Sequence, residues 1–354
     1  MGDQCLMIIF HSYPDSLRGQ IIQPLVVLLD YVYLRAMKFK IFIDGEAGTT
    51  GLKVAERLKT HPHASILGID AAHRKDESAR AEMMAASDIT ILCLPDAAAI
   101  DAARLAAESK TRLIDASSAH RTHSEWVYGF AELQPGQRDA IAAAALITNP
   151  GCYPTGFLAL ARPLIASGLL SDQSLLSIPA VSGYSGGGKS MIERHDAGDL
   201  GPAFSYGTNL QHKHLSEMTK YSGLQTPPIF MPMVADFYAG MLVHIPLHAD
   251  QFASSVTAAM VYDCLADWYQ GSELVHMGAA AANHSDVPPL LAADGLAGCN
   301  DMELFVFSDT VEKRFWITAR LDNLGKGASG AAVQNMNIAL GLNETLGLQI
   351  DAAE

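Results

Sequence analysis

Apolar runs of strand length alternate with amphipathic stretches between residues 40 and 115. Four runs have the length and aliphatic content of buried strands, at 40–44, 65–70, 89–95 and 112–115. The stretches at 52–58 and 97–108 gather their apolar residues on one helical face. Strands and helices that alternate at this spacing predict a doubly wound parallel sheet in an α/β domain.

The pattern changes in the second half of the chain. A strand is predicted at 175–181, and the segments 230–248 and 302–321 alternate apolar and polar residues as half-buried strands do. A helix is predicted at 256–268, lying across them. These elements predict an α+β domain with a mixed sheet. Open sheets of this size often pair between subunits, so we expect a homo-oligomer, either a dimer or a tetramer.

Residues 1–36 do not share the pattern of the rest. The apolar stretch at 21–34 contains Pro24 and Asp30, so it is too short and too interrupted for a membrane span. The basic start and small-residue cleavage site of a secretory signal are missing. We expect a loosely ordered extension before a natural start at Met37; the alternative is an added helix that packs on the domain or on a partner chain.

Composition and charge narrow the class of protein. Hydrophobic residues make up 49% and charged residues 18% of the 354 positions, which is typical of a globular enzyme. The formal net charge of −14 argues against a nucleic-acid binder, so local donors must meet an anionic small-molecule substrate. The 5 cysteines are widely spaced without a Cys-x-x-Cys pair, which indicates free thiols in a reducing, cytoplasmic compartment.

A glycine-rich turn joins the first strand to the first helix. Gly45, Gly48 and Gly51 follow the spacing G-x-x-G-x-x-G, and Thr49 and Thr50 stand where the helix starts. Strand, turn and helix in this order form the Rossmann-type context of a dinucleotide site, in which the helix N-terminus binds the phosphates. We therefore predict that these five residues bind a cofactor.

Charged residues after the second strand bear on which dinucleotide binds. Asp70 would suit a ribose hydroxyl, whereas Arg74 and Lys75 would suit a 2′-phosphate. We favour NADP because two cations follow the strand directly; a solvated charged loop is the alternative. Pro95 comes at the carboxyl end of the third strand, where such sheets bind ligands, so we place it near the cofactor.

Cys152 is the strongest candidate for a nucleophile. It lies in the segment 148–156, between an apolar run at 140–147 and a helix-like stretch at 157–161. The thiol is therefore expected at a helix N-terminus, where free N–H groups and the helix dipole favour a thiolate. A thiolate can attack a carbonyl or an acyl phosphate and hold the acyl group as a thioester. The alternative is a buried cysteine that packs as a small hydrophobe.

Two further segments are candidates for anion binding. Ser118 and Arg121 follow the strand at 112–115 and could clamp a phosphate; the alternative is a helix cap with a surface cation. The glycine-rich segment 182–189 ends in Lys189, which could hold a carboxylate or a phosphate. Its glycine density permits close approach to a ligand, and a flexible linker is the alternative.

His212 and His214 are candidates for proton transfer. Positions i and i+2 do not share a helix face, so we predict no metal site here. One histidine could point inward beside Cys152 and act as general base and then general acid, although each taken alone could be structural. The segment 323–337 brings small residues to the start of a helix that continues to about Leu342, which permits close packing against another element or a nicotinamide.

Together these segments resemble the N-acetyl-gamma-glutamyl-phosphate reductase family, in its second, shorter type, a relative of aspartate-semialdehyde dehydrogenase. The resemblance covers residues 37 to about 350. Four motifs carry it, at 40–51, 149–156, 182–189 and 326–332. The segment 212–218 is also similar to the family's His-x-His-x-x-Glu sequence, with Ser216 where a proline is commoner.

The resemblance implies an NADPH-dependent reduction of N-acetyl-L-glutamyl 5-phosphate to the 5-semialdehyde, in L-arginine biosynthesis, through a thioester on Cys152. His212 is the first choice for proton transfer and His214 the second. Ser118 and Arg121 would hold the leaving phosphate, and Glu217 would orient a histidine or bind substrate. The remaining assignments are Asn149 and Lys189 to the substrate, and Ser185, Gly186, Gly187 and Asn323 to the cofactor.

After the extension, three parts are expected: an NADP-binding domain at 37–150, a catalytic and dimerisation domain at 151–324, and a C-terminal helix at 325–354 that returns to the cofactor domain.

Two rival functions stand beside the implied one. An aspartate-semialdehyde dehydrogenase, or another phosphorylating aldehyde dehydrogenase, would use the same thioester chemistry. A non-catalytic cofactor-sensing regulator or assembly protein would be expected to have lost the nucleophile or the histidine, and this sequence retains both.

Overall fold

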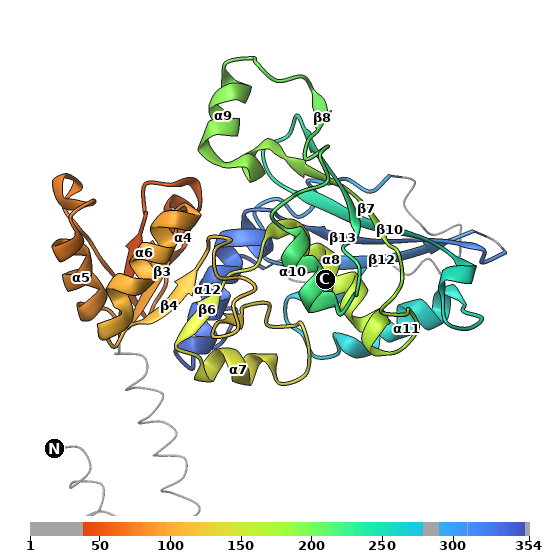
Figure 1. Ribbon diagram of the computed structural model, residues 1–354, viewed down its shortest axis with the longest axis horizontal. Helices are drawn as coiled ribbons and strands as arrows, with labels where there is room; N and C mark the ends of the chain where they lie inside the picture. The colour runs from red at the N-terminus through yellow and green to blue at the C-terminus, as the bar shows by residue number, and fades with distance from the viewer. Residues whose placement is uncertain (1–37, 279–289, 310, 351–354) are drawn as a thin grey trace, which may run out of the picture.

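The computed structural model describes residues 38–278, 290–309 and 311–350. The expectations for residues 1–36 therefore lie outside the described residues. Two sheets, each with its own helices, lie side by side (Figure 1). Within the described ranges, no helix is both long and apolar enough to cross a bilayer.

The first sheet confirms the predicted doubly wound architecture. Its strands lie in the order β2-β1-β3-β4-β6-β5, and every neighbouring pair is parallel. The strands are β1 (Phe39–Asp44), β2 (Ala64–Leu67), β3 (Ile89–Leu92), β4 (Arg112–Asp115), β5 (Val127–Tyr128) and β6 (Leu146–Thr148). The helices of this domain are α4 (Thr49–Lys59), α5 (Glu77–Ala86), α6 (Asp96–Leu105), α7 (Gln137–Ala143) and α12 (Gly330–Ala339).

Successive side chains of a strand point to opposite faces of this sheet, and both faces are buried because helices cover each of them. Ile41 and Ile43 of β1 belong to a core that also contains residues of α4 and α12. Phe42 belongs to a second core, with Met84 of α5 and Ala102 of α6. The continuous apolar strands of the sequence are thus explained by helices that cover both faces.

The second sheet is mixed, as predicted, in the order β11-β12-β13-β10-β7-β9-β8. Its strands are β7 (Ser177–Gly183), β8 (Ala203–Ser205), β9 (Ile229–Ala235), β10 (Met241–His248), β11 (Val275–Met277), β12 (Met302–Ser308) and β13 (Arg314–Leu321). The helices are α8 (Cys152–Ala166), α9 (Gly188–Asp196), α10 (Leu215–Ser222) and α11 (Ala258–Trp268). α8 packs against β10 and β13 on one face of the sheet, with α10 and α11 beside it (Figure 1).

Several predicted boundaries shift for local reasons. β2 ends at Leu67 rather than at Asp70, because the Asp70 carboxylate accepts the backbone N–H of Ala72 and caps a short 3₁₀ turn. The C-terminal helix begins as a π-helical turn, η6 (Gly325–Ser329), and ends at Ala339 rather than near Leu342. α12 contacts α4, α7 and β4 of the first domain. The limits of the domains themselves stay a prediction.

Candidate active site

Cys152 is the first residue of α8, and Gly151 is the N-cap residue. The thiol lies at a cavity of about 370 Å³ whose walls come from both domains. Thr49 and Thr50 contribute from the first domain, and the 3₁₀ turn η4 (Tyr184–Gly187) contributes from the second. The thiol stands at a helix N-terminus, as predicted, and this helix brings it to the junction of the two domains.

Three functional groups crowd around Gly151. A Cβ atom at this position would lie 2.7 Å from Arg121 Nη1, 2.7 Å from His214 Nε2 and 2.8 Å from Glu217 Oε1. Real side chains do not approach so closely, so only glycine lets these groups converge beside Cys152. Gly151 is thus required because neighbouring side chains occupy the space that a side chain at this position would need.

Glu217 is buried at the centre of a hydrogen-bond network. Its Oε1 accepts from Arg121 Nη1 at 2.7 Å, and its Oε2 accepts from the Tyr128 hydroxyl at 2.8 Å and from the Gly151 N–H at 3.1 Å. Both carboxylate oxygens are occupied by these donors rather than by a histidine ring. The carboxylate fixes the guanidinium and the turn before the nucleophile.

The protonation state of Cys152 corrects one expectation. Burial raises the pKa of the Cys152 thiol to about 11, and this effect exceeds the opposing effects of the Tyr153 N–H and the Arg121 guanidinium. The helix N-terminus does favour the anion, as predicted, but desolvation of the thiol outweighs it. The resting group is therefore a thiol at neutral pH, and its reaction requires a base.

Two histidines in the same pocket can serve as that base. Burial, with Lys213 and Arg121, lowers the pKa of His212 to about 4. Burial, with Arg121 and His212, lowers the pKa of His214 well below its ordinary value. Both rings are therefore neutral near pH 7, which is the form that a general base needs, and the same burial makes each a weaker base than a free imidazole. His212 Nδ1 already accepts the backbone N–H of His214 at 3.2 Å.

His214 is the more buried of the two rings and is the N-cap residue of α10. Its Nε2 lies against Gly151, the residue before the thiol. Its Nδ1 is buried and has no hydrogen-bond partner among the described residues. A protonated His214 would still have a free N–H to donate, which suits a group that takes up and returns a proton.

Arg121 and Asn149 are held in place at the wall of the pocket by hydrogen bonds. Arg121 Nε donates to the carbonyl of Asn149 at 3.0 Å, and its Nη2 donates to the carbonyl of Ala116 at 3.3 Å. Asn149 Nδ2 donates to the carbonyl of Ala328 at 2.8 Å, and its Oδ1 accepts from Asn335 Nδ2 at 3.2 Å. Both residues line the cavity, and their orientations are fixed from several elements.

The cofactor side fits a dinucleotide phosphate. Gly48, the N-cap residue of α4, provides no side-chain cap, so the first N–H groups of this 11-residue helix are left for a ligand. Asn323 Nδ2 donates to Ser185 Oγ at 3.0 Å, and Asn323 Oδ1 accepts the N–H of Gly240 at 2.8 Å. Thr49, Thr50, Ser185, Gly186, Gly187 and Asn323 all line the pocket.

Several predicted residues do not line this pocket. Ser118 donates from its N–H and its hydroxyl to the Asp96 carboxylate, at 2.9 and 2.7 Å. The Lys189 side chain is 76% exposed and lies 3.7 Å from Glu193, one turn along α9. Arg74 and Lys75 are exposed in the turn after β2. The structure therefore brings neither Ser118 nor Lys189 to the thiol.

Pro95 is the N-cap residue of α6, just beyond β3, and Gly45 begins the turn that leaves β1. Both stand at the carboxyl edge of the first sheet, where Arg74 and Lys75 also follow their strand. Ligands of doubly wound sheets bind outside this edge.

Two tyrosines of the site were missed from the sequence. The Tyr128 hydroxyl donates to Glu217, and the Tyr206 ring lies edge-on to His212 with centroids 5.7 Å apart. Tyr128 lies on the two-residue strand β5 and Tyr206 follows the three-residue strand β8, and such short strands carry little periodicity. A buried tyrosine does need a hydrogen-bond partner, but the sequence does not name that partner.

The fold and this pocket define a semialdehyde dehydrogenase. The model of the semialdehyde dehydrogenase NAD-binding domain matches residues 40–143, and that of the semialdehyde dehydrogenase dimerisation domain matches residues 152–323. The N-acetyl-gamma-glutamyl-phosphate reductase of Trichormus variabilis is 48% identical over 326 residues, which cover 88% of this chain and 99% of that protein. The reductase of the same name from Brucella ovis is 46% identical over 311 residues, which cover 86% and 100%. The chain belongs to the N-acetyl-gamma-glutamyl-phosphate reductase family.

Solved structures agree on the fold. Aspartate semialdehyde dehydrogenase II from Vibrio cholerae, complexed with ASA, has a TM-score of 0.64 at 15% identity and covers 86% of this chain and 99% of its own. Aspartate semialdehyde dehydrogenase with NADP from Candida albicans has a TM-score of 0.61 at 15% identity and covers 85% and 98%. The two-domain architecture is therefore shared well beyond the sequence family.

Proposed function

We propose that this protein reduces N-acetyl-L-glutamyl 5-phosphate to N-acetyl-L-glutamate 5-semialdehyde and phosphate with NADPH, through a thioester on Cys152, in L-arginine biosynthesis. The observation that carries the proposal is the convergence of Cys152, His214 and Arg121 in one pocket with the turns of both domains. Family membership supports the identity of the acyl group, because the relatives carry this reductase's name.

The first step is attack by Cys152 on the acyl phosphate. Because the thiol is protonated at rest, His214 accepts its proton while sulfur bonds to the carbonyl carbon. The phosphate leaves, and the acyl group stays on sulfur. We assign the proton transfer to His214 ahead of His212, because His214 Nε2 lies against Gly151 whereas His212 Nδ1 already accepts a backbone N–H.

The second step reduces the thioester. NADPH, when bound, supplies the hydride for the carbonyl carbon. His214, now protonated, donates its proton to the developing oxyanion, and the α8 N-terminus helps to stabilise that charge. The thiohemiacetal then collapses: His214 removes the hydroxyl proton, the carbon–sulfur bond breaks, and Cys152 regains a proton as the aldehyde leaves.

The residues that would hold the cofactor follow from the lining of the pocket. The N-terminus of α4 with Thr49 and Thr50 would bind the pyrophosphate. The turn of Ser185, Gly186 and Gly187, braced by Asn323, would cover the nicotinamide end. Arg74 and Lys75 are exposed just after the 3₁₀ turn that follows β2, and cations that follow this strand can meet a 2′-phosphate.

On the substrate side we assign Arg121, fixed by Glu217, to the anion that leaves. Lys213 also lines the pocket and adds a second cation. Ser118 is a poorer candidate than the sequence suggested, because its hydroxyl and N–H already donate to Asp96. These cations provide the local donors that a chain of net charge −14 needs to bind a phosphorylated substrate.

The quaternary state is part of the proposal. The family model names the matched region a dimerisation domain, which indicates that the protein oligomerises. On β9, Ile229, Met231 and Met233 are exposed apolar residues on one face of the second sheet, and Trp316 of β13 is exposed on the same face. We infer that a second copy covers this face, in a dimer or a tetramer. A cytoplasmic location fits Cys93, Cys152 and Cys264, which are free thiols.

The test is phosphate-dependent reduction of NADP with N-acetyl-L-glutamate 5-semialdehyde, run beside L-aspartate 4-semialdehyde. We expect rapid reduction with the acetylated substrate and at most about one hundredth of that rate with the aspartyl one, because a pocket built for one acyl group discriminates by several kcal/mol. Activity with the aspartyl substrate alone would reassign the protein to the sister enzyme. Folded protein that is silent with both substrates would favour a non-catalytic role.

A further inference from the structure

A buried lysine lies beside the active site. Lys326 is 1% exposed, and its Nζ donates to both carboxylate oxygens of Glu132, at 2.9 and 2.8 Å, and to Gln334 Oε1 at 2.7 Å. All three ammonium protons are thereby used. Burial alone would raise the pKa of Glu132, but Lys326 and Arg138 lower it below its ordinary value, which favours the carboxylate form of Glu132. Buried ion pairs contribute little to folding stability, because desolvation of the two charges offsets their attraction. Stability alone therefore does not explain the presence of the pair formed by Lys326 and Glu132.

Lys326 belongs to the π-helical turn η6, which adjoins the nucleophile. π-Helical turns are rare and occur mostly at functional sites. A Cβ atom at Gly327 would lie 2.7 Å from Cys152 Cβ, so the backbone of this residue packs directly on the nucleophile. The next carbonyl, that of Ala328, accepts Asn149 Nδ2 at 2.8 Å. The two residues that follow Lys326 therefore contact both ends of the 149–152 segment.

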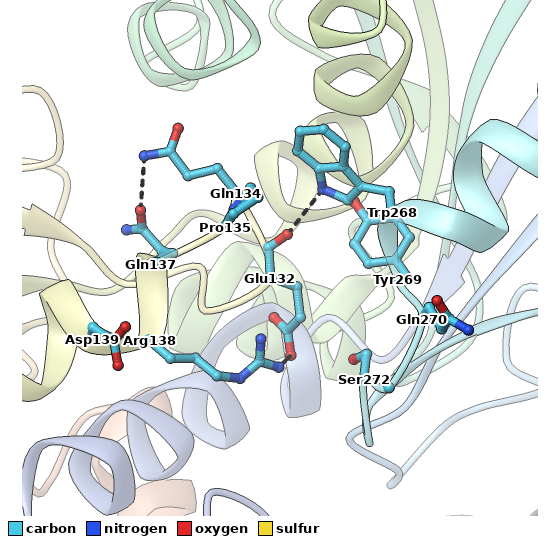
Figure 2. Close-up of a pocket in the computed structure, with 12 residues that line it drawn as sticks. Glu132, Gln134, Pro135, Gln137, Arg138, Asp139, Trp268, Tyr269, Gln270 and Ser272 are labelled. Carbon is cyan, nitrogen blue, oxygen red and sulfur yellow. Dashed lines mark hydrogen bonds and ion pairs between the residues drawn. The ribbon is translucent and has the colours of Figure 1, made fainter.

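The opposite side of the ion pair is anchored in the first domain. Gln334 of α12 donates to Glu132 Oε1 at 2.9 Å and to Glu344 Oε2 at 2.8 Å. Figure 2 shows Glu132 with the Arg138 guanidinium at its carboxylate and the Trp268 indole at its carbonyl. Glu132 is thus fixed from several elements, whereas the turn that carries Lys326 consists largely of small residues.

We propose that Lys326 is a positioning residue, whose ion pair with Glu132 holds the π-helical turn so that Gly327 and Ala328 fix Cys152 and Asn149 in their reactive arrangement. Lys326 does not touch the reacting atoms, and it acts through the backbone that follows it. The proposal rests on the proposed function only for its turnover measurement. Its second measurement, the reactivity of the Cys152 thiol, needs no substrate.

The test compares three variants. Lys326→Met/Glu132→Gln removes both charges together, so that neither is left buried without a partner. Gln334→Leu keeps the ion pair and removes the hydrogen bonds that join Gln334 to Lys326, Glu132 and Glu344. Arg138→Gln is the matched control, because it weakens the contacts of Glu132 from the partly exposed side without touching the turn. Thermal unfolding of each variant shows whether it is folded.

In the folded double variant we expect kcat to fall about tenfold with the KM for NADPH unchanged, because small misplacements of a nucleophile are costly. We expect the rate of Cys152 alkylation by iodoacetamide, followed by peptide mass spectrometry, to fall about tenfold as well. Gln334→Leu should show the same losses at about threefold, and Arg138→Gln should match the wild type. Peptide-level detection is needed because the chain contains other cysteines, such as Cys93 and Cys264, that iodoacetamide can also modify.

Wild-type kcat and wild-type alkylation in the folded double variant would overturn the proposal and leave the ion pair a purely structural role. If the double variant does not fold, Gln334→Leu decides by the same two measurements. A wild-type protein that turns over neither semialdehyde would refute the proposed function alone. The difference in alkylation between the variants would still test Lys326.

Discussion

Single residues of the site are explained more by what surrounds them than by their own chemistry. Gly151 is required because Arg121, His214 and Glu217 meet where its side chain would lie. Cys152 stands at a helix N-terminus and is nevertheless a thiol, because burial has the larger effect on its pKa. The nucleophile motif could be found from the sequence, since the segment 149–156 resembles the motif of the family. The position of Cys152 before a helix left a buried structural cysteine as the alternative. The balance of burial against dipole could not be found from the sequence, because it depends on groups far away in the chain.

Two residues that the sequence suggested for anion binding do not reach the pocket, because their contacts also depend on groups elsewhere in the structure. Lys189 ends a glycine loop, which suggested a ligand contact, but its side chain extends to solvent and pairs within α9. Ser118 follows a strand as a phosphate ligand would, but Asp96 takes its donors. A solvated lysine and a ligating lysine look alike in sequence, because the difference is the direction of one side chain.

The pKa of Cys152 gives a prediction for the free enzyme. With that pKa raised to about 11, the thiolate fraction, and hence the rate of alkylation by iodoacetamide, should rise roughly tenfold per pH unit between pH 7 and 9. The rate is measured on the Cys152 peptide, with the partly buried Cys264 as internal control. A rate that is already level by pH 7 would mean a resting thiolate, and the general-base step would then be unnecessary.

At the scale of elements, α8 depends on a tyrosine from another helix. Pro163 lies inside α8 and has no N–H, so the carbonyl of Ala159 loses its helical donor. The hydroxyl of Tyr269, just beyond α11, donates to that carbonyl at 2.9 Å.

The hydrophobic pattern predicted most strands and helices correctly, because periodicity reports burial. It missed the π-helical turn before α12, since that turn is set by tertiary contacts of small residues.

Tyr269→Phe should therefore destabilise the protein by about 1–3 kcal/mol, because a buried carbonyl is left without a donor. Tyr262→Phe, on α11 itself, is the matched control and should change stability little. Chemical denaturation of the two variants measures the difference. Equal stability of both would show that the hydroxyl of Tyr269 does not support the helix that carries Cys152.

At the scale of the whole molecule, the two sheets have different surroundings. The first is covered by helices on both faces, whereas the second has an exposed apolar face that contains Met231. The sequence predicted both architectures because continuous apolar strands and alternating strands differ visibly. It could not place the pocket at the junction of the domains with named contacts, because residues from positions 49 to 328 meet there.

Met231→Glu should separate the subunits if a second copy covers this face. Burying an unpaired carboxylate costs on the order of 3 kcal/mol, which is about a hundredfold in Kd. Sedimentation velocity over a range of protein concentrations measures the change. Leu175→Glu, at an exposed apolar residue before β7, is the control and should leave the assembly intact. An assembly unaffected by Met231→Glu would place the interface elsewhere.

The central claim, a thioester on Cys152, is tested most directly by omitting phosphate. Enzyme is mixed with N-acetyl-L-glutamate 5-semialdehyde and NADP. The formation of NADPH is followed by absorbance, and the mass of the Cys152 peptide is measured by mass spectrometry. We predict a burst of about one NADPH per active site, an N-acetylglutamyl group on Cys152, and steady turnover only after phosphate is added. Steady turnover without phosphate, or the same burst from Cys152→Ser, would contradict the account.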